Sequence, residues 1–255
     1  MKIQYASDLH LEFGANSQYL RKHPLDVVGD ILLLAGDSGY LGVSQFNNHP
    51  FWDWASEHYT KVIAILGNHE LYAGFDINGL SESLELKLRD NVSLYYNNTI
   101  QLTDRIDLII STLWSYINPL DAFATERSVN DFHYISNGDE RLTAERFNEE
   151  YFRCLNYIKK SVAKSSAEHI IVMTHHVPSF RLMSEEFIGS RINGAFTSEL
   201  GNYIADSRIA YWIYGHSHRN IDGMIGNTKC LSNQLGYVSS GEHLTFRHNA
   251  IIDIP

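Results

Sequence analysis

The chain is patterned as short apolar runs, each of which ends in polar residues. The clearest run covers residues 31–35, Ile-Leu-Leu-Leu-Ala, and contains no polar position. A run of this kind is typical of a strand that is buried on both faces in the middle of an α/β fold. Gly36 and Asp37 follow directly. The pattern therefore predicts a sharp turn and a carboxylate at the carboxyl end of the strand, where ligand sites of α/β folds collect.

Four further apolar runs are followed by side chains of the types that bind metal ions. Scattered surface histidines would not all follow apolar runs, so we expect these strand ends to meet at one site. The runs at residues 2–6, 62–66, 169–174 and 209–214 lead in turn to Asp8 and His10, to Asn68 and His69, to His175 and His176, and to His216 and His218.

The rest of the chain alternates helical and strand-like patterns, which predicts βαβ units first, then a mixed part and an antiparallel end. Apolar positions at helical spacing predict helices at residues 44–59, 80–89, 143–163 and 197–205, and a short helix is expected within 16–30. Strand-like runs are expected at 92–96, 99–102 and 106–112, with a β-meander from residue 221 onward. Residues 114–140 predict a long loop segment with short helices, which either borders the site or forms a surface excursion.

Composition narrows the class of protein. With 255 residues and 44% hydrophobic content, the chain can bury a substantial core, and we expect one domain over residues 1–255. The formal charge is −10, from 30 acidic and 20 basic residues. Since no block of Lys and Arg tracks a polyanion, long duplex nucleic acid is an unlikely partner. Bound metal ions would still make a site locally positive, so a phosphate substrate remains compatible with this charge.

The expected location is the cytoplasm. The two cysteines, Cys154 and Cys230, are far apart and are interpreted as reduced thiols, although one disulfide remains open. The first residues form a strand pattern directly, without the basic and apolar regions of a signal peptide. No run is long enough to span a membrane, so no membrane partner is expected.

An aspartate shared by two divalent ions, with asparagine and histidine around it, is in chemical terms a dinuclear hydrolytic site. Imidazole and carboxylate ligands suit manganese, iron, zinc, cobalt or nickel better than calcium. Two such ions, roughly 3.5–4 Å apart, can hold both sides of an in-line displacement at phosphorus and activate a bridging water.

Five motifs stand in a fixed order: Asp-x-His, Gly-Asp, Gly-Asn-His-Glu, Thr-His-His and Gly-His-Ser-His. In this order, from Ser7 to His218, the chain resembles the calcineurin-like metallophosphoesterase family. Thr112-Leu113-Trp114 and Asn130-Asp131-Phe132 are similar to its small bacterial-type members. The resemblance implies an α/β (α+β) fold, a two-sheet β-sandwich flanked by helices, with the site on loops at one edge.

The resemblance also implies roles for individual residues. It implies two divalent metal ions, with manganese favoured, and a bridging hydroxide as the nucleophile. One ion would be held by Asp8, His10 and His218, the other by Asn68, His175 and His216, with Asp37 shared by both. His69 would contact the substrate, either protonating the leaving oxygen or stabilising charge on the phosphoryl group.

Several neighbouring residues are expected in supporting roles. His175 is preferred over His176 as the ligand because it directly follows the strand, but the reverse remains open. His176 would then support the ligands or face the substrate. The same roles are open for Trp114, Asn130, Asp131, His133 and Arg219.

The sequence departs from the family pattern in two places. Protein phosphatases of this superfamily follow Gly-Asp with an Asp-Arg-Gly that supplies a partner for the catalytic histidine, whereas this chain reads Ser38-Gly39-Tyr40. A phosphoprotein substrate is therefore disfavoured. In the bacterial-type relatives a Cys-Asn-Pro-Arg-Gly-Tyr segment follows the last histidines, and its arginine is missing from residues 231–237.

The favoured function is hydrolysis of a small-molecule or nucleotide phosphodiester. A phosphomonoester remains the alternative, because one metal centre can serve both. A nuclease would need a groove for a strand, which the acidic composition disfavours. A non-catalytic protein-binding scaffold is disfavoured because all seven expected ligands and His69 are present.

Overall fold

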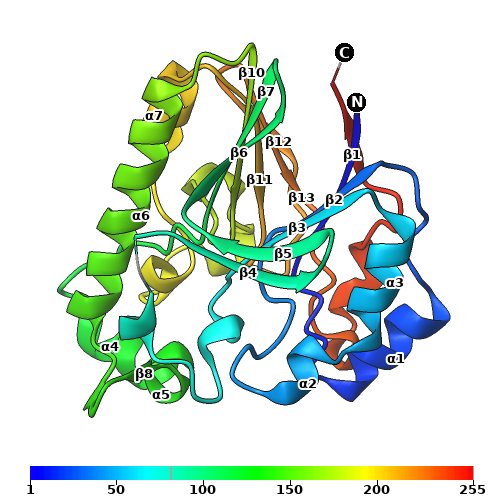
Figure 1. Ribbon diagram of the computed structural model, residues 1–255. Coiled ribbons are helices and arrows are strands. Elements are labelled where there is room, and N and C mark those ends of the chain that lie inside the picture. Colours follow the sequence, from blue (N-terminus) through cyan, green and yellow to red (C-terminus); the bar gives the residue numbers. More distant parts are fainter. Residues whose placement is uncertain (81, 255) are drawn as a thin grey trace.

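The computed structural model describes residues 1–80 and 82–254. Two six-stranded mixed sheets pack face to face, with helices on their outer faces (Figure 1). This arrangement confirms the expected two-sheet sandwich. The first sheet has the order β14 (Ile251–Asp253), β1 (Lys2–Ala6), β2 (Ile31–Leu34), β3 (Lys61–Ile65), β5 (Val92–Tyr96) and β4 (Leu84–Arg89). The second has the order β12 (Gly223–Ile225), β13 (Thr228–Ser232), β11 (Ile209–Tyr214), β10 (His169–Thr174), β7 (Ile106–Ser111) and β6 (Asn98–Thr103).

The four central strands of each sheet run parallel. These are β1, β2, β3 and β5 in the first sheet and β13, β11, β10 and β7 in the second. The strands at the two edges of each sheet pair antiparallel to them. Because parallel strands end on the same side, the loops that follow them in each sheet leave from one edge, which is where α/β folds place their ligands.

The core has two parts, one between the sheets and one beneath the helices. Successive strand residues point to opposite faces. Accordingly, Ile31 and Leu33 of β2 belong to the cluster between the sheets, whereas Leu32 and Leu34 belong to the cluster under the helices. All four are at most 6% exposed. The unbroken apolar run is therefore buried on both faces, as predicted.

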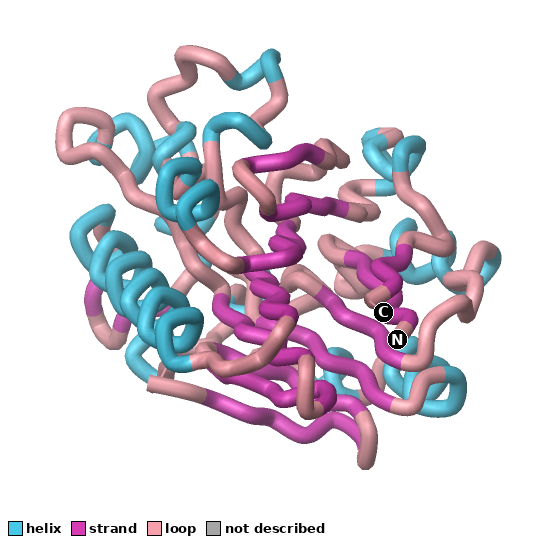
Figure 2. The backbone as a smooth tube through the Cα atoms, turned by 90° about the horizontal axis from the view of Figure 1, so that it is seen from above, coloured by secondary structure: helices cyan, strands magenta, loops and turns pink. Residues whose placement is uncertain are grey.

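Helices cover both outer faces, and a small two-stranded sheet extends the loop region. Helix α6 lies against β7 of the second sheet, and α3 lies against β3, β4 and β5 of the first, so the sheets are enclosed between them (Figure 2). The helices are α1 (Gly14–Lys22), α2 (Ser44–Asn47), α3 (Pro50–His58), α4 (Ala122–Ser128), α5 (Asp131–Tyr134), α6 (Ala144–Lys164) and α7 (Gly201–Asp206), and the small sheet is β8 (Ser136–Asn137) with β9 (Glu140–Arg141). The expected long helix at 143–163 and the short helices within 16–30 and 114–140 are confirmed.

Two predicted helices are wrong. Residues 84–89 form strand β4 instead of a helix, because Leu84, Leu86 and Leu88 alternate and pack on one core cluster, although leucines four apart also fit a helix. Residue 81 of that predicted helix lies outside the described residues. The single helix expected at 44–59 is split into α2 and α3. His49 is extended because it precedes Pro50, and Pro50 then begins the new helix.

Two further predictions near the carboxyl end need correction. Helix α7 begins only at Gly201, because the backbone N–H groups of Ser198 and Leu200 donate to Val177 and Pro178 instead of to a helix. The expected meander after residue 221 is wrong: β13 runs parallel to β11, and β14 joins the other sheet beside β1. Glycine spacing marks turns but does not identify strand partners, and successive residues of β13, Cys230 and Leu231, are buried in different core clusters, so both faces of this strand are covered.

The two termini lie side by side because β1 and β14 pair antiparallel (Figure 1). Within residues 1–80 and 82–254, the helices are all too short or too polar to cross a lipid bilayer.

Helix α6 offers a direct test of the core under the helices. Phe147 is fully buried and packs on Trp114 and Phe132, whereas Phe152 on the same helix is 50% exposed. Phe147→Ala should lower the free energy of unfolding by about 3–5 kcal/mol, since it leaves a cavity. The matched control Phe152→Ala should lower it by less than about 1 kcal/mol. Urea unfolding measures both, and equal losses would contradict the assigned burial of α6.

Candidate metal centre

The loops after five parallel strands bring their polar side chains together at one edge of the sandwich. Three groups of His and Asp have ligand atoms that all lie within 4.8 Å of one another. They are Asp8, His10 and His218; His10, Asp37 and His69; and Asp37, His175 and His216. Asp37 belongs to two of the three groups. It follows β2 of the first sheet and lies close to His175 and His216, which follow β10 and β11 of the second sheet.

The first group gathers around the facing ring nitrogens of two histidines. Nε2 of His10 lies 3.0 Å from Nε2 of His218, and Oδ1 of Asp8 lies 3.4 Å from Nε2 of His218. Oδ2 of Asp37 lies 3.7 Å from Nε2 of His10. Three different loops therefore point imidazole and carboxylate atoms at the same small volume.

The second group gathers around His175. Its Nε2 lies 3.3 Å from Oδ1 of Asp37, 2.9 Å from Oδ1 of Asn68 and 3.1 Å from Nδ1 of His216. Asp37 thus turns Oδ1 toward this group and Oδ2 toward the first. The amide oxygen of Asn68 faces the cluster because its nitrogen donates to Oδ1 of Asp131 at 2.8 Å.

The outer ring nitrogens of three histidines are already engaged. Nδ1 of His10 lies 3.0 Å from Glu12, Nδ1 of His218 lies 2.7 Å from Glu242, and Nδ1 of His175 lies 2.9 Å from the carbonyl oxygen of Ala35. An imidazole that donates from Nδ1 keeps its Nε2 lone pair for a cation. In His216 the arrangement is reversed, since Nε2 faces the carbonyl oxygen of Ala195 and Nδ1 faces the cluster.

The charges of the cluster suit a cation. Burial by itself lowers the pKa of His175, but the adjacent Asp37 carboxylate raises it to about 9. Burial likewise lowers the pKa of His218, and its hydrogen bonds to Asp8 and Glu242 raise it to about 10. The same carboxylates that hold protons on these rings would attract a metal ion in their place.

Backbone strain is concentrated at the same positions. Nine non-glycine residues have a positive φ within the described part of the chain, and five of them are expected ligands. These are Asp8, His10, Asp37, His216 and His218, with φ between 47° and 75°. Such conformations persist only where the surroundings enforce them, and they cluster at functional sites. The enforcing contacts include the backbone N–H of His216, which donates to Oδ1 of Asp8 at 3.0 Å.

Glu70 connects the loop that follows β2 with the loop that follows β3. Its carboxylate is fully buried and accepts hydrogen bonds from the backbone N–H groups of Asp37, Ser38 and Gly67 at 2.6–3.0 Å. Burial, together with the Asp37 carboxylate, raises the pKa of Glu70 to about 8. The glutamate of the Gly-Asn-His-Glu motif therefore fixes the backbone of the loops and does not face the ligand cluster.

Three glycines leave room that the cluster fills. A Cβ atom at Gly67 would lie 2.2 Å from Oδ1 of Asp37 and 2.9 Å from Nε2 of His175. A Cβ at Gly36 would lie 2.5 Å from Nδ1 of His175, and one at Gly215 would lie 2.5 Å from Oδ2 of Asp8. The glycines before the expected metal ligands are thus required by close approach, and the donor set of nitrogen and oxygen atoms fits divalent transition metals.

His69 lies at the edge of the cluster. It is the first residue of a 3₁₀ turn, His69–Leu71, and its backbone N–H donates to Oδ1 of Asp37 at 2.9 Å. Its ring lies across from the same carboxylate, with Nε2 4.0 Å from Oδ2 of Asp37. Nδ1 lies 2.9 Å from Glu12, and the Tyr237 hydroxyl lies 3.4 Å from Nε2.

The structure separates the paired histidines that the sequence left open. His175 is in the cluster, whereas His176 lies behind it, with its ring 4.1 Å from that of His216 and 5.4 Å from that of Trp114. His176 is buried, and among the described residues neither of its ring nitrogens has a hydrogen-bond partner. Trp114 is fully buried against His176 and Phe147, so it supports the site from the core.

Of the other expected supporting residues, two lie next to expected metal ligands and two are exposed away from them. Asp131 contacts the cluster through Asn68, and Arg219 follows His218 with Nε 2.5 Å from Oε1 of Glu186. Asn130 and His133 are exposed. Nε2 of His133 lies 3.4 Å from the carbonyl oxygen of Arg127. Of the segment 114–140, therefore, Asp131 borders the cluster and these two residues do not.

Sequence reasoning missed Glu12, Glu242 and Tyr237. Glu12 had a signal, because Asp8, His10 and Glu12 alternate with Leu9 and Leu11 in the sequence. Its carboxylate lies 2.9 Å from Nδ1 of His69. Glu242 and Tyr237 follow all five motifs and reach the site only through tertiary folding.

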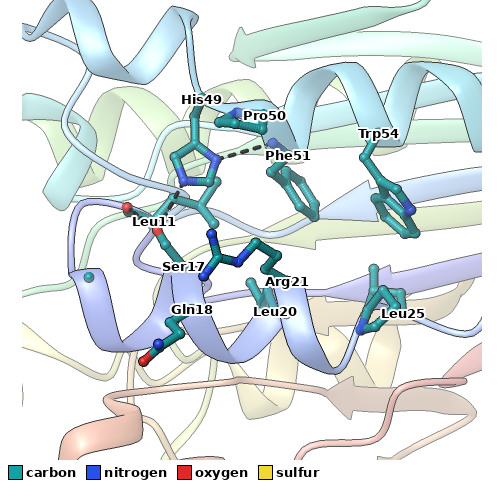
Figure 3. A pocket seen from close by; sticks show the side chains of 12 residues that line it. Leu11, Ser17, Gln18, Leu20, Arg21, Leu25, His49, Pro50, Phe51 and Trp54 are labelled. Atoms are coloured by element: carbon teal, nitrogen blue, oxygen red, sulfur yellow. Dashed lines mark hydrogen bonds between the residues drawn. The ribbon is translucent and has the colours of Figure 1, made fainter.

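A cavity lies beside the loop that follows β1, which carries His10 and Glu12 (Figure 3). It has a volume of about 660 Å³ and opens between α1 and α3. Leu11, Leu20, Leu25 and Phe51 form its buried floor. Leu11 lines this cavity, whereas its neighbour His10 belongs to the ligand cluster and Glu12 contacts His10 and His69, so the loop separates the two spaces.

A two-sheet α/β sandwich that gathers histidine and carboxylate ligands at the ends of its parallel strands defines a class of metal-dependent hydrolases. A family model described as calcineurin-like phosphoesterase matches residues 1–220. The chain belongs to this family, it is a phosphoric ester hydrolase, and the family depends on divalent metals. The resemblance expected from the five motifs is confirmed.

Individual proteins resemble this chain in sequence or in fold. The chain is 31% identical over 280 residues to the uncharacterized protein L509 of Acanthamoeba polyphaga mimivirus, covering 99% of this chain and 96% of that protein. Its fold is similar to that of phosphopantetheinyl hydrolase (PptH) from Mycobacterium tuberculosis, with a TM-score of 0.69, 13% identity and coverage of 98% and 95% of the two chains. It is also similar to TT1561 of Thermus thermophilus, with a TM-score of 0.54, 11% identity and coverage of 94% and 91%.

The close approach at Gly67 generates a test of the ligand cluster. Gly67→Ala should reduce the metal bound per chain severalfold, because the new methyl group displaces the Asp37 carboxylate. The control Gly79→Ala should bind as much metal as the parent protein, since its Cβ would lie 3.8 Å from Phe75 in ordinary contact. Elemental analysis after dialysis gives the metal content and circular dichroism checks the fold. Full metal content in a folded Gly67→Ala protein would contradict this cluster as the metal site.

Proposed function

We propose that this protein is a dinuclear metal-dependent phosphodiesterase whose seven metal ligands are Asp8, His10, Asp37, Asn68, His175, His216 and His218. The observation that carries the proposal is that the two carboxylate oxygens of Asp37 face separate ligand groups, 3.7 Å from His10 and 3.3 Å from His175. A carboxylate in this position can bridge two cations. Residues 1–255 act in this proposal as one domain, since the supporting contacts run from Asp8 to Glu242.

The two ions, for which manganese is favoured by the mixed nitrogen and oxygen donors, would supply Lewis acidity and an activated water as nucleophile. The chain itself supplies orientation. Glu12 and Glu242 hold the outer nitrogens of His10 and His218, so the inner nitrogens keep one direction. Asp131 holds the amide of Asn68 with its oxygen turned inward.

His69 is the proposed catalytic residue that acts on the leaving group. Its Nδ1 lies 2.9 Å from the Glu12 carboxylate, and Asp37 lies on its other side. Although burial lowers the pKa of His69, Asp37 and Glu12 together raise it above its usual range. A protonated ring beside the bound phosphate can donate to the oxygen that departs, either as a proton or as a hydrogen bond.

A diester is favoured over a monoester by the charge around the ligands. A phosphomonoester is a dianion at neutral pH, whereas a diester carries one charge. Within the described residues, no lysine or arginine is ion-paired with Asp8 or Asp37. Arg219, next to His218, is already paired with Glu186 and lies 3.9 Å from Glu242. A singly charged phosphodiester therefore suits this site better than a doubly charged phosphomonoester. A phosphomonoesterase of the same mechanism is the alternative.

Relatives do not narrow the substrate further. The Mycobacterium neighbour is named for phosphopantetheinyl hydrolysis, but at 13% identity the likeness concerns the fold. A nuclease and a protein-binding scaffold remain less favoured, the first because of the acidic composition and the second because the ligand set is complete.

The proposal is tested by replacing the shared ligand. The parent protein with Mn²⁺ should bind two ions per chain and hydrolyse bis(p-nitrophenyl) phosphate faster than p-nitrophenyl phosphate. Asp37→Asn should lower the occupancy of both sites, because the charge between two cations is lost. The diesterase rate should fall about 10²-fold or more. Asp104→Asn, which changes an exposed aspartate, serves as the control.

Two results would count against this function. Loss of only one ion in Asp37→Asn would show that the aspartate is not shared. A monoester rate above the diester rate in the parent protein would favour the phosphomonoesterase alternative.

The role of His69 is tested with leaving groups of different acidity. His69→Ala should keep its metal and fold but lose about 10²–10⁴-fold in kcat on diesters with a poor leaving group, and less on p-nitrophenyl esters, which need little protonation. Glu12→Gln should give a smaller loss of the same kind. Equal losses on good and poor leaving groups would reject the general-acid role, and loss of metal would make His69 a support for the ligands.

A further inference from the structure

Five aromatic side chains form a continuous arc beside His69. Their ring centroids follow one another at 5.3–6.4 Å. We call this set the aromatic arc; in spatial order it consists of Tyr237, Phe13, Tyr40, Tyr72 and Tyr134. These residues come from five separate segments, so the fold, and not a local run of sequence, gathers them.

The aromatic arc surrounds His69 on one side of the ligand cluster. The ring of Tyr72 stacks on that of His69 at 4.4 Å, and the rings of Tyr40, Phe13 and Tyr237 lie 5.8–6.4 Å from it. Within the described residues, no ring of the arc is in ring contact with His175 or His216, whose ring neighbours are His176 and Phe196. Phe13 and Tyr237 also contact the ring of His10, at 5.9 Å and 4.8 Å, and Tyr237 contacts the ring of His218 at 4.6 Å. The arc therefore borders His69 and the group around His10 and His218, on the side away from His175 and His216.

Parts of the aromatic arc face solvent. Phe13 is 37% exposed and Tyr134 is 58% exposed, and Tyr40 and Tyr237 are half-buried. Tyr72 anchors the arc from below, since its hydroxyl donates to Oδ1 of Asp131 at 2.5 Å. Exposed aromatic rings that gather over a site in this way mark a place where a ligand ring can pack.

The aromatic arc also offers polar groups to such a ring. The hydroxyls of Tyr40 and Tyr134 have no hydrogen-bond partner among residues 1–80 and 82–254, and the Tyr237 hydroxyl reaches the His69 ring at 3.4 Å. Since the five members carry no positive charge, they suit a neutral aromatic group with polar edges better than a second phosphate.

We propose that the aromatic arc binds an aromatic ring in the leaving group of the substrate, which makes aryl and nucleoside phosphodiesters the preferred substrate class. The inference rests on the proposed function, in which His69 acts on the departing oxygen. In an in-line displacement the leaving group departs opposite the nucleophile, here on the His69 side. A ring attached to that oxygen would pack against the exposed members of the arc, Phe13 or Tyr134.

The test compares two diesters whose leaving groups have similar acidity but differ in aromaticity, methyl phenyl phosphate and methyl hexafluoroisopropyl phosphate. The parent enzyme with Mn²⁺ should prefer the phenyl ester by about tenfold in kcat/KM, the scale of one stacking contact. Phe13→Leu and Tyr134→Leu keep apolar volume but remove a ring, and each should reduce this preference severalfold. Phe123→Leu, which changes a 73% exposed phenylalanine on α4, should keep the parent ratio.

A binding measurement keeps the inference testable if turnover is too slow. Adenosine should bind the Mn²⁺-loaded protein in calorimetry, with a Kd about tenfold weaker in the Phe13→Leu/Tyr134→Leu double variant. A parent enzyme that hydrolyses both esters equally well, or a double variant with an unchanged ratio, would overturn the role of the aromatic arc and leave the phosphodiesterase function standing. Adenosine binding without hydrolysis of either ester or of bis(p-nitrophenyl) phosphate would instead reject the proposed function.

Discussion

The position of Asp37 is the constraint on which the rest of the site depends. Its carboxylate must follow a fully buried strand, turn through a left-handed conformation and place one oxygen toward each ligand group. These demands explain several neighbouring features. Gly36 and Gly67 leave the space that the carboxylate and His175 occupy, and Glu70 holds the backbone of both loops with a buried carboxylate. A strained and charged group is thus kept in place by rigid elements of both sheets.

The site is built in layers, from the sheets outward to the substrate side. The strand ends supply ligand atoms, and a second set of oxygens then fixes the direction of each imidazole. Glu12 connects this layer to His69, the proposed catalytic residue, since one of its oxygens lies about 3 Å from both His10 and His69. Beyond His69 lies the aromatic arc, where specificity toward the leaving group would arise.

Much of the fold and most of the ligand cluster could be predicted, because the signals are local. A strand buried on both faces must be apolar throughout, so the runs at 31–35 and 169–174 identify central strands directly. Parallel strands end on one side, and the side chains that follow them must share an edge. Prediction failed where the helical and the strand period fit the same residues. Leu84 and Leu88 are compatible with a helix and with a strand, and residues 84–89 form β4, in which Leu86 packs on the same core cluster as these two leucines.

The sequence by itself determined the central strands that carry the site, the ligand types at their ends and the family. Only the tertiary structure decided which atoms face one another. It placed His175 in the cluster and His176 behind it, paired Glu12 with His69, and brought Tyr237 back across more than two hundred residues to the first loop. The physical reason is that residue types and periodicity are written locally, whereas contacts between distant loops depend on how the two sheets pack and where their edges meet.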